Sequence, residues 1–190
     1  MIKPVARGTA IADGIRADIP LSADMRLLDI GAGGGEVSIE LAPYVKSILA
    51  IDTSEEVLGR LREKIEQDQV LERKFETRCH DLSIEPLSSD SFDLVMASMT
   101  LHHVEKTDSL LDNLAAIVRP GGYVAIADLE TEDGSFHGTT RAVPHHGFDT
   151  QLLAERLTRL GFDVISCREI FQIERGERRY PVFLLTGRKE

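Results

Sequence analysis

Cysteine, basic charge and long apolar runs are all scarce in this sequence of 190 residues. Its two cysteines, Cys79 and Cys167, are too few for a disulfide framework or a multi-thiolate metal site. Both lie in apolar or strand-like sequence, so we expect them to line the core. No run reaches the roughly 18 consecutive apolar residues of a membrane span, and residues 1–12 lack the apolar stretch of a signal peptide. These absences predict a cytoplasmic protein with no membrane partner.

The shortage of basic charge is clear from 22 Lys and Arg against 32 Asp and Glu, a formal net charge of −10. That charge repels the phosphate backbone of nucleic acids, so no nucleic-acid partner is expected and a small molecule is the better substrate. The one basic run, Arg175 with Arg178 and Arg179, is interrupted by Gly176 and Glu177. We expect it to be a solvated hairpin turn.

Apolar runs of strand length alternate with amphipathic stretches of helix length, which predicts an α/β fold with a mostly parallel sheet. The expected strands are residues 25–30, 47–51, 75–79, 92–97, 123–127, 162–166 and 182–186, and the expected helices are residues 5–16, 34–41, 55–67, 109–118 and 150–160. A polar stretch with Gly176 separates the last two strands, which favours an antiparallel terminal pair. The length and composition fit a single domain over residues 1–190, with a short N-terminal segment at residues 1–24.

A glycine cluster follows the first expected strand, in the run Asp29-Ile30-Gly31-Ala32-Gly33-Gly34-Gly35. Glycines permit a sharp strand-to-helix turn and let a ligand lie against the backbone, although a tight turn alone would also explain them. A dinucleotide fingerprint would place its third glycine at position 36, where the sequence has Glu36. This charge disfavours a pyrophosphate, whereas the carboxylate of Asp29 suits a ligand with an ammonium group.

Two further acids follow later expected strands. Asp52 ends the second strand about 20 residues after the glycine loop, where a carboxylate can accept hydrogen bonds from both hydroxyls of a ribose. Asp81 follows the third strand at the same sheet edge and could accept a hydrogen bond from an adenine amine. The alternatives are a helix-capping or exposed loop acid for Asp52 and a solvated loop acid for Asp81.

These motifs together resemble the class I S-adenosylmethionine-dependent methyltransferases, specifically the small group similar to ubiquinone and menaquinone biosynthesis C-methyltransferases. The resemblance spans residues 26–189. Residues 27–35 match the first motif, Asp52 the ribose acid, and residues 79–82 the adenine-side loop. Residues 92–95 with 101–104 resemble the fourth-strand motif, and residues 114–122 resemble the helix and turn before the fifth strand.

The resemblance implies a Rossmann-like, doubly wound sheet of seven strands, with the last strand antiparallel and helices on both faces. It also implies S-adenosylmethionine as cofactor, lying across the carboxyl ends of the strands. The cofactor-binding residues that we predict are Asp29, Gly31, Ala32, Gly33, Asp52, Thr53, Asp81, Leu82, Ala97 and Ser98.

The histidines fall mainly in two segments that follow the fourth and fifth strands. They are His102 and His103 in the first segment, and His137, His145 and His146 in the second. His103 and His146 are the candidates for substrate orientation or proton transfer, and packing and loop-pinning roles are the alternative. No metal site is expected, because adjacent histidines on one segment rarely point at one ion and no ligand spacing is evident.

The polar segment at residues 128–148 is the expected lid, because loops of this length in compact domains are usually functional or disordered. The N-terminal segment is short, which leaves the acceptor pocket open and leaves room for a homodimer partner to complete it. Three functions remain open at this stage: methyl transfer to a small-molecule acceptor, non-catalytic cofactor binding as a regulatory or partner subunit, and nucleotide-dependent oxidoreduction. Glu36 counts against the third, and fold alone does not decide between the others.

Overall fold

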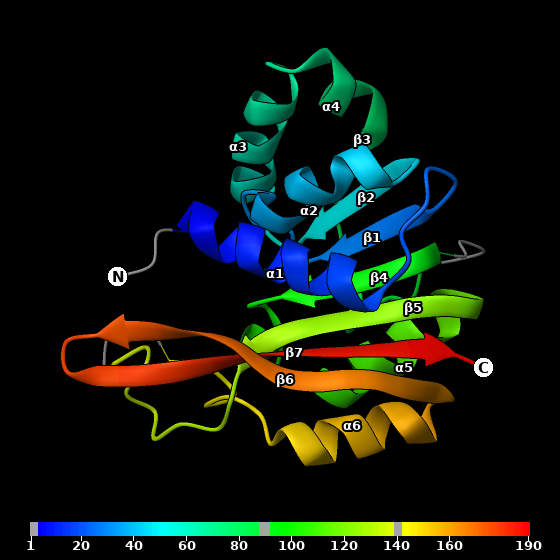
Figure 1. The fold of residues 1–190 in the computed structure, drawn as a ribbon. Coiled ribbons are helices and arrows are strands. Elements are labelled where there is room, and N and C mark those ends of the chain that lie inside the picture. The colour runs from blue at the N-terminus through cyan, green and yellow to red at the C-terminus, as the bar shows by residue number, and fades with distance from the viewer. Residues whose placement is uncertain (1–3, 88–91, 139–141) are drawn as a thin grey trace.

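The computed structural model describes residues 4–87, 92–138 and 142–190. Its centre is a seven-stranded sheet with the strand order β3-β2-β1-β4-β5-β7-β6 (Figure 1). The strands are β1 (Arg26–Ile30), β2 (Ser47–Asp52), β3 (Phe75–Cys79), β4 (Phe92–Ser98), β5 (Val118–Leu129), β6 (Phe162–Arg175) and β7 (Arg178–Lys189). The helices are α1 (Pro4–Asp18), α2 (Glu36–Leu41), α3 (Glu55–Ile65), α4 (Gln69–Lys74), α5 (Thr107–Ile117) and α6 (Thr150–Arg159), with the 3₁₀ turns η1 (Ala42–Tyr44) and η2 (Leu101–His103). Within the described ranges, no helix is both long and apolar enough to cross a membrane.

Five strands of the sheet, β1 to β5, run parallel to one another. The last strand, β7, lies between β5 and β6 and is antiparallel to both. This confirms the expected mostly parallel sheet and its antiparallel last strand. Because β1, β2, β4 and β5 point the same way, their carboxyl ends meet at one edge of the sheet, where ligands of open α/β sheets bind.

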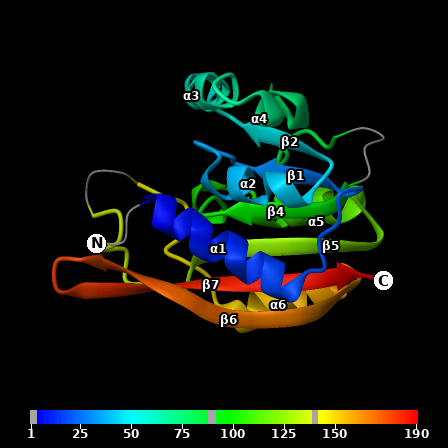
Figure 2. The same ribbon diagram turned by 45° about the horizontal axis from the view of Figure 1, so that its top comes forward.

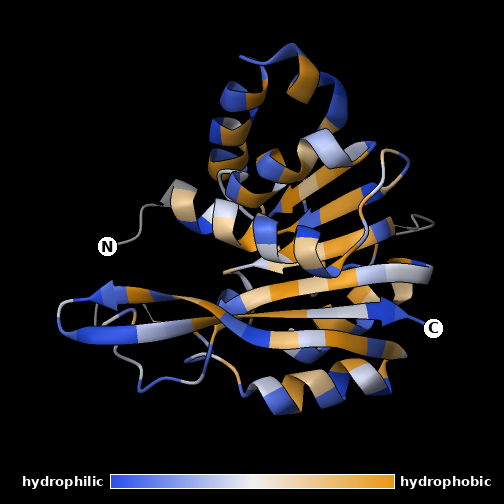
Figure 3. Ribbon diagram, in the orientation of Figure 1, coloured by the Kyte–Doolittle hydropathy of each residue, from blue (hydrophilic) through white to orange (hydrophobic). Residues whose placement is uncertain are grey.

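Helices cover both faces of the sheet, and the two views agree on which helices lie together (Figures 1 and 2). On one face, Ile11 and Ile15 of α1 pack with Leu27 of β1, and α2 and α3 lie on the same side. On the other face, α5 and α6 pack against the side that includes Leu28. Neighbouring residues of β1 thus enter opposite cores, as expected for a strand buried on both faces. The central strands are accordingly the most hydrophobic part of the ribbon (Figure 3).

The terminal hairpin is much longer than the strands expected at residues 162–166 and 182–186. Its pairing with β5 ends at Leu129 opposite Val182, but β6 and β7 continue together as far as Arg175 opposite Arg178. The tip of this two-stranded extension is largely hydrophilic, which hides it from a search for apolar runs (Figure 3). The arginine run lies at the hairpin turn, as predicted.

The expected boundary of the polar segment at residue 128 is wrong, because β5 extends through Leu129. Asp128 is fully buried, and its carboxylate accepts hydrogen bonds from the side chain of His102 and from the backbone amide of Leu129. Such partners offset the cost of burying a carboxylate, which sequence patterns do not reveal. Positions 139–141 of the expected lid lie outside the described residues.

The expectation that both cysteines line the core is also wrong. Cys79 and Cys167 are exposed. They lie on β3 and β6, the two edge strands of the sheet, which the helices cover less completely than the central strands. Neither cysteine lines the two cavities of the functional site described below.

Candidate active site

The loop after β1 turns on glycines that adopt a left-handed backbone. Gly31, Gly33 and Gly35 have φ angles of 64°, 55° and 73°, which glycine adopts without strain. A Cβ atom on Gly31 would overlap the side chain of Thr100, whose hydroxyl donates a hydrogen bond to the carbonyl oxygen of Gly31. The loop backbone therefore lies directly against the end of β4, and both a positive φ and a close approach require glycine here.

Two adjoining cavities lie along this loop. The small cavity, of about 180 Å³, lies between α1 and the carboxyl ends of β1 and β4. Its walls include Asp29, Gly31, Ala32 and Ser98, all of them predicted cofactor-binding residues. The large cavity, of about 630 Å³, includes the predicted residues Gly31, Gly33, Asp52, Thr53, Asp81 and Leu82. Gly31 and Met99 belong to both walls, so the two cavities adjoin, and together they are called the trough below.

Asp29 places a buried carboxyl at the small cavity. Asp29 is only 3% exposed to solvent. This burial raises the pKa of Asp29 to about 7, and repulsion from Glu36 and Asp52 acts in the same direction, whereas a hydrogen bond from Ser38 opposes it. An adjacent cation favours the ionised form of a carboxyl. The small cavity therefore suits the positively charged end of a ligand.

Asp52 and Asp81 lie along the large cavity, and each is fixed by hydrogen bonds. The carboxylate of Asp52 accepts from the amide of Gly33 over 3.0 Å and from the amide of Ser54 over 2.9 Å. Helix α3 is capped by the hydroxyl of Ser54, which accepts a hydrogen bond from the amide of Val57. A carboxylate has about four lone-pair sites, so Asp52 keeps acceptor capacity for a ligand. Asp81 accepts from both the amide and the hydroxyl of Ser83.

Ala97 differs from the other predicted cofactor-binding residues, because it lines neither of the two cavities. It is 1% exposed and packs within the core.

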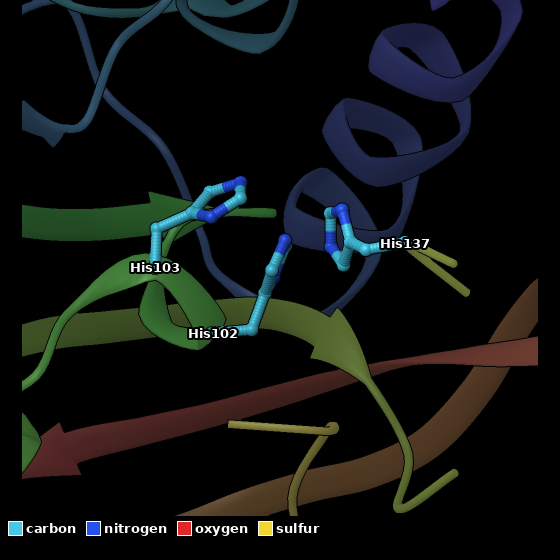
Figure 4. Close-up of side chains that lie close together, drawn as sticks. All are labelled: His102, His103 and His137. Atoms are coloured by element: carbon cyan, nitrogen blue, oxygen red, sulfur yellow. The ribbon is translucent and has the colours of Figure 1, made fainter. Parts of the chain in front are cut away.

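The structure brings three of the histidines from the two predicted segments together, and His146 is not among them. His102 and His103 on η2 lie close to His137 from the segment after β5 (Figure 4), with one ring nitrogen of each within 4.8 Å of the others. His103 also lines the large cavity. His146, the other catalytic candidate, is exposed and lies 3.5 Å from a carboxylate oxygen of Glu132.

His145 joins the polar segment after β5 to the start of α5 and the residues just before it. Its Nε2 lies 2.9 Å from the Thr107 hydroxyl and 3.0 Å from the Val104 carbonyl oxygen. This contact matches the loop-pinning alternative for that residue.

Comparison with known families decides the class of this site. A family model described as a methyltransferase domain matches residues 28–126, just over half of the chain. The chain belongs to the class I S-adenosylmethionine-dependent methyltransferases. The matched part of this methyltransferase begins within β1 and ends within β5, so it contains the glycine loop and the predicted cofactor-binding acids Asp29, Asp52 and Asp81.

Curated relatives of this methyltransferase are about 30% identical to it. An uncharacterized methyltransferase of Schizosaccharomyces pombe is 30% identical over 137 residues, 65% of this chain and 48% of the relative. A ubiquinone biosynthesis O-methyltransferase of Coxiella burnetii is 30% identical over 96 residues, 50% of this chain and 40% of the relative. A 27-O-demethylrifamycin SV methyltransferase of Amycolatopsis mediterranei is 31% identical over 121 residues, 63% and 44% of the two chains. The matches span about half or less of these relatives' lengths.

Solved structures confirm the fold of this methyltransferase. The YcgJ protein of Bacillus subtilis superposes with a TM-score of 0.79 over 96% of this chain and 98% of that chain, at 14% identity. The N-methyltransferase NodS of Bradyrhizobium japonicum, in complex with S-adenosylhomocysteine, superposes with a TM-score of 0.76 over 98% and 88% of the two chains, at 17% identity. The sheet order and the antiparallel β7 therefore follow the methyltransferase fold.

Sequence reasoning missed three contributors to this methyltransferase site. Arg7 and Gly8 of α1 line the small cavity, and Met99 lies between the two cavities with a positive φ of 53°. A helix was expected near residues 5–16, but nothing in its pattern shows that its first turn faces the sheet edge. A positive φ at methionine is uncommon and has no sequence signal, since it follows from the turn between β4 and η2.

Proposed function

We propose that this protein transfers the methyl group of S-adenosylmethionine to a small-molecule acceptor. The observation that carries the proposal is the trough formed by the two cavities, with Asp29 on one side of Gly31 and both Asp52 and Asp81 on the other. When bound, S-adenosylmethionine supplies a methyl group on a sulfonium sulfur, and this carbon is the electrophile.

The residues present in the trough fit this cofactor. The buried carboxyl of Asp29 suits an ammonium group, because an adjacent cation would offset the desolvation that raises the pKa of Asp29. Asp52 retains acceptor capacity that suits ribose hydroxyls. The hydrogen bond that its carboxylate accepts from the Gly33 amide fixes the glycine loop next to the ribose position. The loop formed by Asp81 and Leu82 suits the adenine. Thr53, Ala32, Ala97 and Ser98 complete the predicted set.

A small acceptor is favoured by the size of the site and by the relatives. The large cavity, at about 630 Å³, falls within the range of roughly 300–1,000 Å³ that is typical of small-molecule sites, and in this proposal it holds the adenosyl part of the cofactor as well as the acceptor. Two curated relatives are named as O-methyltransferases of ubiquinone biosynthesis and of a demethylrifamycin. An oxygen acceptor attacks the methyl carbon as the carbon–sulfur bond breaks, and its proton leaves for a base or for water.

Positioning of the acceptor falls to residues at the ends of β4 and β5. We assign acceptor orientation or proton transfer to His103, because it lines the large cavity. His146 stays a candidate for the same role, although in this structure its ring faces Glu132. In-line displacement requires mainly a near-attack geometry and the exclusion of water, which a cavity wall supplies.

A transfer experiment distinguishes this function from cofactor binding alone. The protein is incubated with methyl-labelled S-adenosylmethionine and a cell extract, and the label is followed into small-molecule and macromolecular fractions separated by size. We expect label in the small-molecule fraction, at a much lower rate for Asp52→Ala. Label in macromolecules would contradict a small-molecule acceptor. Bound cofactor with no transfer to either fraction would favour a regulatory or partner subunit.

A further inference from the structure

The three rings of His102, His103 and His137 converge on one space at the ends of β4 and β5 (Figure 4). Their ring centroids are 4.1 Å apart for His102 and His103, 5.1 Å for His102 and His137, and 5.3 Å for His103 and His137. We propose that these three imidazoles form a binding site for a divalent transition-metal ion of the zinc type. The expectation of no metal site assumed that adjacent histidines point apart, and here they do not.

Asp128 determines which nitrogen of His102 faces the cluster. Oδ1 of Asp128 lies 2.6 Å from Nδ1 of His102 and also accepts the amide of Leu129 over 2.7 Å. An oxygen that accepts an amide acts as an acceptor toward the ring as well, so Nδ1 of His102 carries the proton. Its Nε2 then presents a lone pair. A carboxylate that fixes the tautomer and orientation of a histidine in this way is the usual support of a metal-binding imidazole.

His137 is held in place by the tip of the β6–β7 hairpin. The neighbouring Phe136 packs against Tyr180 with ring centroids 5.1 Å apart, and the guanidinium of Arg175 lies over the Phe136 ring, 3.9 Å from its centroid. Arg175 also donates a hydrogen bond to the carbonyl oxygen of Phe136, and the hydroxyls of Ser135 and Tyr180 lie 2.7 Å apart. The third histidine therefore comes from a segment fixed before any ion binds.

The spacing of the nitrogens is close to what coordination requires. With zinc–nitrogen bonds of roughly 2.0–2.1 Å, tetrahedral geometry places two nitrogens about 3.3 Å apart. The present separations, all within 4.8 Å, need only small side-chain rotations to reach that value. Simple ring packing would not require the Asp128 hydrogen bond that orients His102. Imidazole donors favour zinc, iron, nickel or copper over magnesium and calcium, which prefer oxygen ligands.

Three histidines leave a coordination position for a ligand from outside the chain. Because His103 also lines the large cavity, that position would face the space assigned to the acceptor. An ion there would hold an acceptor oxygen and ease the loss of its proton. This role rests on the proposed methyl transfer, whereas the binding of the ion does not.

Titration with Co²⁺, followed by visible absorption and by calorimetry, tests the site directly. The protein carries no polyhistidine tag and is first dialysed against a chelator. We expect one Co²⁺ per chain, displaced by Zn²⁺, with affinity at least about tenfold weaker in His103→Ala, His137→Ala and Asp128→Asn. His146→Ala is the matched control and should bind Co²⁺ as the unmodified protein does. Thermal unfolding of every variant shows whether the fold is retained.

Absence of Co²⁺ and Zn²⁺ binding would overturn the inference. So would undiminished binding in folded His103→Ala and His137→Ala, or an equal loss in His146→Ala. His103 and His137 are less buried than His102, so their variants keep the test valid even where Asp128→Asn does not fold. If the protein binds S-adenosylhomocysteine but neither Co²⁺ nor Zn²⁺, the metal site alone is overturned. If it binds Co²⁺ or Zn²⁺ but not S-adenosylhomocysteine, the proposed function alone is overturned.

Discussion

The hydroxyl of Thr100 donates a hydrogen bond to the carbonyl oxygen of Gly31 over 3.1 Å, which joins the loop after β1 to the turn after β4. The same hydroxyl lies 3.0 Å from the carbonyl oxygen of Ser98. Gly31, the acceptor of this hydrogen bond, and Met99, which precedes Thr100 in the chain, line both cavities. The contact between Thr100 in the turn after β4 and Gly31 in the loop after β1 therefore fixes the junction between the two cavities.

Substitution of Gly31 by alanine should damage both stability and ligand binding. The alanine would have to adopt a positive φ of 64°, and its Cβ would overlap the side chain of Thr100. We expect Gly31→Ala to lower the free energy of unfolding by roughly 1–3 kcal/mol. It should also abolish measurable binding of S-adenosylhomocysteine, because Thr100 would be displaced into the trough. Urea denaturation and calorimetry measure the two effects.

Gly59→Ala is the matched control for that substitution. Gly59 lies inside α3, and a Cβ there would meet nothing within 4 Å. Alanine is the better helix former, so this variant should be more stable by about 0.5–1 kcal/mol and should bind S-adenosylhomocysteine normally. Equal behaviour of the two variants would show that the contact with Thr100 does not matter.

The buried carboxyl of Asp29 should make stability fall as pH rises. Its pKa is about 7 in the folded protein and near 3.8 in the unfolded chain, so the folded state binds more protons between these values. Stability from this group is thus full below about pH 4 and is lost progressively up to about pH 7, by at most about 1.4 kcal/mol per pH unit. The unmodified protein should lose stability relative to Asp29→Asn across this interval. Parallel curves of unfolding free energy against pH would contradict the prediction.

The same carboxyl predicts the pH dependence of ligand binding. If Asp29 must ionise to pair with the ammonium group, affinity for S-adenosylhomocysteine should rise up to about tenfold per pH unit below pH 7 and level off above it. Calorimetry between about pH 5.5 and pH 7.5 measures this slope. Asp29→Asn should bind weakly and with a much flatter dependence. An affinity that falls with rising pH in the unmodified protein would exclude this role for Asp29.

The fold was largely predictable because the central parallel strands are apolar and helices such as α3, α5 and α6 are amphipathic, whereas β3 has no buried residue. Residues 47–51 and 92–97, for example, lie within β2 and β4 as expected. The distal halves of β6 and β7 were missed because their pairing with each other beyond Leu129 needs no continuous apolar sequence. Asp128 was missed for a related reason, since a buried carboxylate in a strand is recognisable only once its partners are known.

The trough was also predictable in part, because glycines and acids at strand ends have a fixed relation to the sheet edge. Asp29, Asp52 and Asp81 all lie in the cavity walls. The grouping of the histidines was not predictable, because His137 reaches η2 only through the packing of Phe136 on Tyr180 and Arg175. Three-dimensional contacts between loops determine that grouping, and local sequence does not encode them.

Calorimetric titration with S-adenosylmethionine, S-adenosylhomocysteine and NAD tests the central claim most directly. The unmodified protein is compared with Asp52→Ala and with the control Asp68→Ala. Like Asp52, Asp68 accepts hydrogen bonds from backbone amides, but it caps α4 on the protein surface. We predict that both adenosyl ligands bind the unmodified protein and Asp68→Ala, that binding to Asp52→Ala is lost or much weakened, and that NAD does not bind. Binding of NAD in place of the adenosyl ligands, or undiminished binding to Asp52→Ala, would contradict the account of this site.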